Sequence, residues 1–300
     1  MSPVRCPGCG SEDVRVKGPI PDNWMFAGND VGLMPAELAV CRTCHLGFRS
    51  PQPRIEELGA LYESGSESAW SADELERRDW ELAAGWVNRL GATSVLDVGC
   101  FDGGFLGLLP GSVRKAGVEI NAAAARRAAG RGVKIVARDL NDLAELNQQF
   151  DLVAAFDVIE HVHDPSGFLA TLANVVLPGG HVIFATGDLE AATARIMGSR
   201  HLYSWFLEHI SFVSPRWVRR AAPRLGFDIV SIEHFSHTSE VRFGFLAGML
   251  KNGVYKMSPR LLDRVRAIAR PSREPLSVPT APPAWTSARD HMLVVLRKRA

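Results

Sequence analysis

The sequence lacks a strong net charge and a long apolar run, and its first residues are polar. Its 300 residues carry a formal charge of only +1, so the whole-chain field gives no sign of a nucleic acid or an anionic membrane as partner. No apolar run reaches the roughly 18 residues that a membrane-spanning helix needs. The polar start, MSPVRCPGCG, has no apolar signal-peptide core. We therefore expect a soluble, cytoplasmic protein.

Cysteine is also scarce, but four of the five cysteines form two close pairs, Cys6-Pro-Gly-Cys9 and Cys41-Arg-Thr-Cys44. The C-x-x-C spacing lets both thiolates of a pair reach one ion, and two pairs complete a tetrahedral shell of four sulfurs. Zinc is the expected metal, with iron as the lesser option. We expect a structural role, because a unit of this size cannot build a sufficient core of its own. Residues 1–50 are not notably basic, which makes a nucleic-acid-binding role the weaker alternative.

Strands and helices alternate along the rest of the chain, which indicates parallel βαβ units in an open, doubly wound sheet. A last strand follows a long insertion. The predicted strands are Ser94–Val98, Lys115–Glu119, Val133–Ala137, Asp151–Phe156, His181–Thr186, Asp228–His234 and His291–Arg297. The predicted helices are Ile55–Tyr62, Ala72–Leu90, Gly104–Leu109, Ala122–Gly130, Leu140–Leu146, Ser166–Val176 and Pro215–Leu225.

The segment VLDVGCFDGG, Val95–Gly104, places a glycine-rich turn between a strand and a helix. Such a turn lets a ligand approach the backbone, and the N–H groups at the helix start point outward. Many ligand classes use this turn, but three acids narrow the choice: Asp97 in the first strand, Glu119 at the end of the second and Asp139 after the third. Glu119 is placed to accept hydrogen bonds from ribose hydroxyls, and Asp139 from an adenine amine.

Taken in order over about Ser94–Ile232, the motifs resemble those of class I S-adenosylmethionine (SAM)-dependent methyltransferases. They are VLDVGC, GVEIN, ARDL, FDLVAAFDVIEHV and LPGGHVIFAT. The resemblance implies an α/β fold with a Rossmann-like, seven-stranded and mostly parallel sheet, a small N-terminal zinc unit and a helical insertion before the last strand. It also implies SAM as cofactor, bound by Asp97, Gly99, Cys100, Phe101, Gly103, Glu119, Ile120, Asp139, Leu140 and Phe156.

The loop departs from the family pattern at Phe101, where the family usually has glycine. The phenyl group either narrows the loop or packs outward against an apolar neighbour. An NAD-dependent oxidoreductase is the alternative, because Glu119 follows Gly99 at a spacing that also suits a dinucleotide. The G-x-G-x-x-G spacing is missing, however, which favours SAM. Cys100 has no evident histidine partner and is expected to be a buried spacer.

Candidate catalytic groups follow the fourth strand of the alternating region and precede the Pro215 helix. Asp157, His161 and His209 are the predicted catalytic residues, because methyl transfer to a hydroxyl or amine is helped by a general base. For His161, ordering of its loop through hydrogen bonds is an equal alternative, and for His209 the alternative is a structural cap. Some related quinone O-methyltransferases bind a divalent ion at a similar Glu-His motif, which here would involve Glu160. Tyr203 and Trp205 could face an aromatic or sugar-like acceptor, and Tyr62 and Trp70 could close over SAM.

The chain is divided into five predicted segments: a four-cysteine unit at 1–53, entry helices at 54–92, a SAM-binding core at 93–235, a basic helical insertion at 236–289 and the last strand at 290–300. The region 240–270 is expected to be a lid, a homodimer surface or a peripheral membrane contact. We expect methylation, at oxygen, of a small-molecule, sugar or glycan acceptor. The alternatives are a zinc-ribbon nucleic-acid-binding protein or RNA methyltransferase, and the oxidoreductase above.

Overall fold

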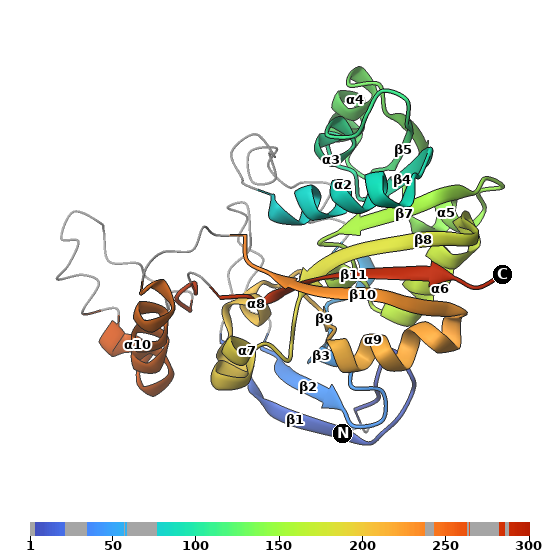
Figure 1. Ribbon diagram of the computed structural model, residues 1–300. Helices are drawn as coiled ribbons and strands as arrows, with labels where there is room; N and C mark the ends of the chain where they lie inside the picture. The colour runs from blue at the N-terminus through green and yellow to red at the C-terminus, as the bar shows by residue number, and fades with distance from the viewer. Residues whose placement is uncertain are drawn as a thin grey trace.

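A seven-stranded sheet forms the centre of the molecule (Figure 1). The computed structural model describes residues 4–21, 35–56, 58, 77–237, 243–262, 264, 282–285 and 288–300. The strands are β4 (Ser94–Val98), β5 (Arg114–Val118), β6 (Lys134–Ala137), β7 (Phe150–Phe156), β8 (Val176–Gly187), β10 (Phe227–Phe235) and β11 (His291–Lys298), in the spatial order β10-β11-β8-β7-β4-β5-β6. Pairing is parallel from β8 to β6, and β11 is antiparallel to both of its neighbours. The predicted α/β fold with a mostly parallel sheet is confirmed.

Helices cover both faces of this sheet, because successive strand residues face opposite sides and both sides are apolar. On β11, Leu293 and Val295 belong to one core cluster and Val294 and Leu296 to the other. The first cluster is completed by α2 (Arg78–Leu90), α3 (Gly104–Gly107) and α4 (Ala122–Gly130). The second is completed by α5 (Leu140–Ala144), α6 (Pro165–Val175) and α9 (Pro215–Ala221). The result is a three-layer core whose strand ends are free to build a site.

Several helices begin or end at residues of a type that favours helix capping. Asn121, Asp139, Asp164 and Ser214 each accept backbone N–H hydrogen bonds at the start of α4, α5, α6 and α9. Gly91 ends α2 in the left-handed conformation, at φ 64°. Of the predicted Ala72–Leu90 helix, the structure describes the part from Arg78 onward. Most of the predicted Ile55–Tyr62 helix lies outside the described residues.

A second, four-stranded antiparallel sheet carries the cysteine pairs. Its strands are β1 (Val14–Pro19), β2 (Glu37–Cys41), β3 (Gly47–Ser50) and β9 (Ser211–Phe212), in that spatial order. The last strand comes from the large domain, and its Phe212 pairs with Gly47. Cys6, Leu46 and Phe48 share a core cluster with the helices on one face of the large sheet. The cysteine unit is therefore built into the large domain.

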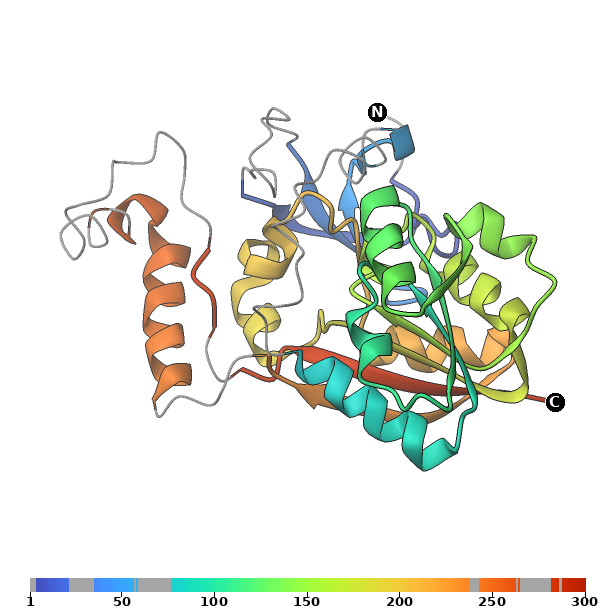
Figure 2. The same ribbon diagram turned by 90° about the horizontal axis from the view of Figure 1, so that it is seen from above.

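The insertion before β11 contributes α10 (Gly244–Met257), which stands beside α7 (Ala192–Met197) in both views (Figures 1 and 2). Tyr255 of α10 packs with Met197 of α7 and with Trp285. Within the described residues, no helix is long and apolar enough to cross a membrane.

Candidate functional site

The predicted SAM loop joins β4 to α3 through three residues with positive φ: Gly99 at 77°, Phe101 at 47° and Gly103 at 82°. A Cβ on Gly99 would lie 2.8 Å from Val158 Cγ2, so glycine is required there for space as well as conformation. The ring of Phe101 lies against the guanidinium of Arg127, with the guanidinium carbon 5.4 Å from the ring centroid. Phe101, which stands where the family usually has glycine, is therefore stabilised by a contact with a cation.

Glu119, which directly follows β5, is hydrogen-bonded to the backbone of this loop. Its Oε2 accepts the Phe101 N–H at 2.8 Å and its Oε1 accepts the Asn121 N–H at 2.7 Å. Burial raises the pKa of Glu119, although these backbone N–H groups oppose that effect. The carboxylate therefore lies beside the loop at the strand ends, where the sequence placed it.

Asp97, near the end of β4, is a further acid of the loop region, and it is 2% exposed. Its Oδ1 is buried and has no hydrogen-bond partner among the described residues. Burial raises the pKa of Asp97 well above its usual range, against the lowering effect of nearby Arg77. Buried carboxyl oxygens normally have a partner, so this atom marks a place where a polar ligand group would be stabilised.

The remaining residues assigned to SAM lie around the same strand ends but differ in what they contact. Phe156 is 7% exposed and packs on Phe105, with ring centroids 4.7 Å apart. Cys100 is buried, and burial raises the pKa of its thiol, which fits a spacer and not a nucleophile. Asp139 uses Oδ1 to accept the N–H groups of Asn141 and Asp142, which caps α5. Ile120 and Leu140 are half-buried beside Glu119 and Asp139. Whether these residues bind SAM stays a prediction.

Beyond β7 and β8 lies a second group of polar side chains. The Tyr203 hydroxyl, in α8 (Leu202–Trp205), donates to Glu160 Oε1 and accepts the Gly187 N–H at 2.9 Å. Glu160, which is 1% exposed, leaves its Oε2 buried without a partner among the described residues. Burial, together with the neighbouring Asp157 charge, raises the pKa of Glu160 to about 8. The sequence predicted Tyr203 only as a possible acceptor contact, and Glu160 as a candidate base and as part of a Glu-His motif that could bind a divalent ion.

His161 and His209, the two predicted catalytic histidines, meet at this group with ring centroids 5.0 Å apart. One ring nitrogen of each and a Glu160 oxygen lie within 4.8 Å of one another. The Nδ1 of His209 lies 2.8 Å from the Tyr203 carbonyl oxygen, which can only accept. His209 therefore carries its proton on Nδ1, and Nε2 has the free lone pair. Burial lowers the pKa of His161 to about 4 and that of His209 well below its usual value.

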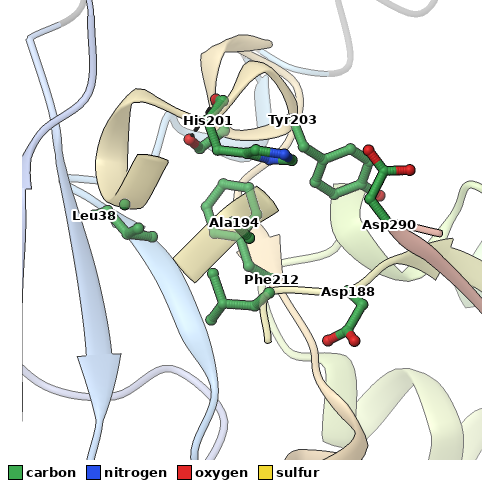
Figure 3. A pocket seen from close by; sticks show the side chains of 10 residues that line it. Leu38, Asp188, Ala194, His201, Tyr203, Phe212 and Asp290 are labelled. Carbon is green, nitrogen blue, oxygen red and sulfur yellow. Dashed lines mark hydrogen bonds between the residues drawn. The ribbon is translucent and has the colours of Figure 1, made fainter. Parts of the chain in front are cut away.

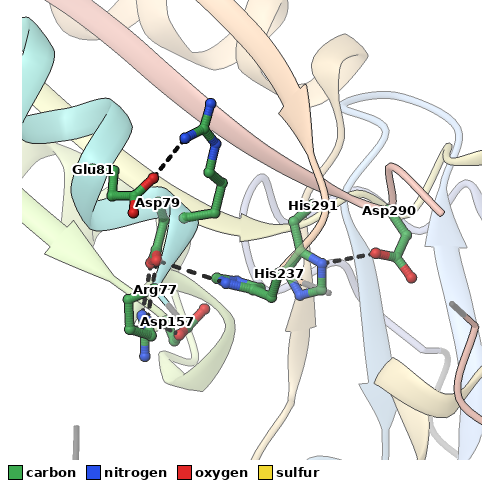
Figure 4. Close-up of polar contacts among 8 residues, drawn as sticks. Arg77, Asp79, Glu81, Asp157, His237, Asp290 and His291 are labelled. Carbon is green, nitrogen blue, oxygen red and sulfur yellow. Dashed lines mark hydrogen bonds and ion pairs between the residues drawn. The ribbon is translucent and has the colours of Figure 1, made fainter. Parts of the chain in front are cut away.

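Asp157, the third predicted catalytic residue, has a strained backbone at φ 52° and faces a cation that sequence reasoning missed. Arg77 donates to Asp157 Oδ2 at 2.8 Å and to both oxygens of Asp79 (Figure 4). His237, after β10, lies 3.7 Å from Asp79 Oδ1. Its ring is 4.8 Å from that of His291, at the start of β11. No local motif marks the residues around Asp157, because they come from three distant segments of the chain, at Arg77–Asp79, His237 and His291.

A small pocket adjoins Tyr203 on the side of the cysteine unit (Figure 3). His201 lines it with a buried Nε2 that has no partner among the described residues. Asp188 and Asp290 supply carboxyl groups, while Leu38 and Phe212 supply an apolar wall. The lining combines apolar surface with a few convergent polar groups, and the cavity volume of about 10 Å³ is close to that of one water molecule.

The four paired cysteines come together as the spacing predicted. Cys6 Sγ lies 3.5 Å from Cys44 Sγ, and Cys9 Sγ lies 3.6 Å from Cys41 Sγ. All four sulfurs lie within 4.8 Å of one another. A tetrahedral zinc with bonds of about 2.3 Å needs sulfurs roughly 3.8 Å apart, so the donor set fits zinc. Burial raises the pKa of Cys41, but the backbone N–H groups of Cys44 and Thr43 outweigh it and lower the pKa to about 7.

The cysteine unit also reaches the histidines through Arg49 of β3, which is 1% exposed. Its guanidinium donates to the carbonyl oxygens of Ser204 at 2.9 Å, Phe206 at 2.8 Å and His209 at 3.4 Å. Three bonds to one short segment fix the backbone that carries Tyr203 and His209. Sequence reasoning missed Arg49, because a buried arginine has no local signature.

Comparison of the sequence with known proteins identifies the family to which the chain belongs. The model of the family described as "Methyltransferase domain" matches residues 69–232, just over half of the chain. Two curated relatives are ubiquinone biosynthesis O-methyltransferases. That of Sinorhizobium medicae is 35% identical over 124 residues, covering 37% of this chain and 48% of the relative. That of Rhizobium rhizogenes is 30% identical over 154 residues, covering 46% and 60%. The chain thus spans about half the length of the curated relatives it matches.

Among solved structures, one similar chain comes from the complex between the Haloferax volcanii Trm112 methyltransferase activator and a methyltransferase. It is 15% identical with a TM-score of 0.52, over 81% of this chain and 98% of that one. At this identity the likeness is one of fold.

Proposed function

The chain belongs to the methyltransferase-domain family, and we propose that it transfers the methyl group of SAM to a hydroxyl oxygen of a small-molecule or glycan acceptor. The observation that carries the proposal is a pair of buried, unpartnered carboxyl oxygens among the described residues, Asp97 Oδ1 and Glu160 Oε2. They lie on either side of the strand ends of β4 and β7, where open α/β sheets bind ligands. Asp97 is placed to contact the methyl donor, and Glu160 to contact the methyl acceptor.

The donor side fits SAM in three respects. Gly99 and Gly103 give the loop the positive φ angles of a tight turn between a strand and a helix. Asp97 Oδ1 would accept a hydrogen bond from the amino group of the methionine part. Glu119 would also accept hydrogen bonds from the ribose hydroxyls, because each carboxylate oxygen can accept more than the one backbone N–H, of Phe101 or Asn121, that it binds here. SAM, when bound, supplies a methyl group already activated on a sulfonium.

The acceptor side is proposed to centre on Glu160, Tyr203 and His209. Glu160 Oε2 and the Tyr203 hydroxyl orient the acceptor hydroxyl, and the free Nε2 of His209 takes its proton as the oxygen attacks. Because burial keeps His209 neutral by lowering its pKa, its lone pair is available at neutral pH. His161 packs edge-on against His209 and holds its ring in place.

The chemical nature of the acceptor is inferred from the residues that line the small pocket beside Tyr203. Carboxyl groups of Asp188 and Asp290 accept hydrogen bonds from hydroxyls, and Phe212 and Leu38 offer apolar surface. A hydroxyl group of the acceptor matches this mixture, and the cavity of about 10 Å³ has room for such a group and not for a whole sugar or phenol. The curated relatives act, by their names, in ubiquinone biosynthesis as O-methyltransferases, which supports oxygen as the methylated atom.

We further propose that the four-cysteine cluster holds one structural zinc. Its four thiolates would close the tetrahedral shell and leave no position for chemistry. The metal would stabilise β1 to β3 and, through Arg49, the segment from Ser204 to His209.

Two measurements test the proposed reaction. Calorimetry should show micromolar binding of SAM and S-adenosylhomocysteine and none of NAD; NAD binding without SAM binding would reject it. A screen of methyl transfer to phenols, sugar nucleotides and lipid-linked sugars should then find a hydroxyl acceptor. Turnover confined to amine or RNA acceptors would contradict the acceptor assignment while leaving the donor assignment intact.

A further inference from the structure

Helix α10 lies on the protein with its small and polar side. The residues it buries are Gly244, Gly248, Asn252 and Tyr255, which follow one another at helical spacing. Gly248 lies directly against Trp285, since a Cβ there would come within 3.1 Å of the indole ring. The small face permits this close approach, and it turns the other side of the helix outward.

The outward side carries the large apolar residues. Leu246 is 55% exposed, Met249 46%, Leu250 74% and Met257 79%, and Leu261 just beyond the helix is 47% exposed. We call these five residues the α10 outer face. A helix at the surface of a globular domain normally buries its apolar stripe. Here that orientation is reversed, and contiguous exposed apolar patches of this kind mark interaction sites.

The charge around the α10 outer face has one sign. Lys251, Lys256 and Arg260 are exposed next to it. The sequence has no aspartate or glutamate between Val241 and Leu262. The next acid in the sequence is Asp263, so within this stretch the apolar residues are flanked by cations alone. Such a face complements a surface that is apolar beneath and anionic above.

We propose that the α10 outer face docks on the surface of an anionic phospholipid bilayer, with the helix lying in the plane of the membrane. At 14 residues, or roughly 21 Å, α10 is too short to cross a hydrocarbon core of about 30 Å. A second copy of the chain fits less well, because it would bring the same cations together. A face one helix wide also falls short of the roughly 800 Å² per partner that stable dimers bury.

The docked helix is coupled to the proposed acceptor side. Arg200 donates to the Lys256 carbonyl oxygen and Lys256 to that of Ile196, so α10 is fixed to the segment that leads into Tyr203. Membrane docking would hold this side of the protein near the bilayer. The docking itself is independent of the proposed reaction.

Flotation of the full chain with vesicles tests the proposal. The wild type should float with vesicles of phosphatidylcholine and phosphatidylglycerol at about 7:3 and not with phosphatidylcholine alone, and added salt should weaken binding. The variant Leu246→Glu/Leu250→Glu should lower the bound fraction at least fivefold. The variant Lys251→Glu/Arg260→Glu should lower it to a similar extent on anionic vesicles. Leu108→Glu, at an equally exposed leucine of the core domain, should bind as the wild type does.

Two kinds of result would overturn the proposal. The first comes from flotation: either the wild-type protein does not float with anionic vesicles, or an α10 variant floats as well as the wild type. The other is a dimer in sedimentation velocity that Leu246→Glu/Leu250→Glu converts to monomer, which would make this face a contact between copies. Circular dichroism and the thermal midpoint of each variant establish that the fold is retained.

Discussion

Tyr203 and Glu160 share a hydrogen bond of 2.5 Å in which the phenol donates to the carboxyl oxygen Oε1. The bond joins α8 to the turn after β7, 43 residues apart in the chain. The same phenol oxygen accepts the Gly187 N–H at the end of β8. Three segments of the proposed acceptor side are therefore held by one hydroxyl group.

Removing that hydroxyl should impair catalysis more than binding. We expect Tyr203→Phe to lower kcat by roughly 30-fold, equivalent to about 2 kcal/mol for a lost hydrogen bond to a buried carboxyl group. Affinity for S-adenosylhomocysteine should change less than twofold. Tyr255→Phe, at a buried tyrosine of α10, is the matched control and should keep the wild-type kcat. Equal rates for the two variants would exclude Tyr203 from the acceptor site.

The strands were predictable because they form short apolar runs, which in the central strands β4 and β7 are buried along almost their whole length. Six of the seven strands begin within one residue of their predicted starts. The exception is β8, which begins at Val176 and not at His181, since Leu177–Gly180 continue the strand despite a proline and two glycines. The clustering of the four cysteines was equally predictable, because the C-x-x-C spacing lets both sulfurs of a pair reach one point and the two pairs match.

What the sequence could not reveal is how distant segments meet. Arg49 lies 155 residues from Ser204, whose carbonyl oxygen it binds, and Arg77 lies 80 residues from Asp157. Neither arginine stands in a motif, and their burial follows only from the folded arrangement. The predicted roles of Tyr62 and Trp70 fall on residues outside the described part of the chain.

Glu119 should control SAM affinity. We expect Glu119→Ala to weaken SAM binding by about 30-fold or more, because it removes the ribose acceptor and the partner of the Phe101 N–H. Glu119→Gln keeps an amide oxygen for one of these bonds and should lose less. Calorimetric titration with S-adenosylhomocysteine measures both. Wild-type affinity in Glu119→Ala would refute the ribose assignment.

The cysteine cluster should hold metal in a stoichiometric amount. Purified protein should contain close to one zinc per chain, and Cys41→Ser should lose it together with several degrees of thermal midpoint. Cys100→Ser is the matched control, since Cys100 is also buried but lies outside the cluster, and it should retain zinc. Metal-free protein with unchanged stability would argue against a structural zinc.

Arg49 should link the cysteine unit to turnover. Lysine at this position keeps the charge but loses the planar fork that reaches three carbonyl groups. We expect Arg49→Lys to cost about 1–3 kcal/mol of stability and to lower kcat, with the zinc content unchanged. Arg42→Lys, at an exposed arginine of the same unit, should affect neither. A loss of stability without any loss of kcat would restrict Arg49 to a role in folding.

His201 should make the stability of the protein sensitive to acid. Burial lowers its pKa from 6.5 to about 4, with the nearby Asp290 charge opposing that effect. The unfolded chain therefore binds a proton at His201 below pH 6.5, while the folded chain does not until about pH 4. Stability is consequently lost as the pH falls through this window, by about 1.4 kcal/mol at pH 5.5 from this residue alone.

The His201→Gln variant isolates this contribution. Its free energy of unfolding should fall less between about pH 7.5 and pH 5.5 than that of the wild type, by roughly the same 1.4 kcal/mol. His161, His209 and His237, whose pKa values burial also lowers, keep a residual slope in the variant. Urea titrations at the two pH values measure the difference. Parallel losses in the two proteins would show that His201 is already protonated in the fold, which would place a partner on its Nε2.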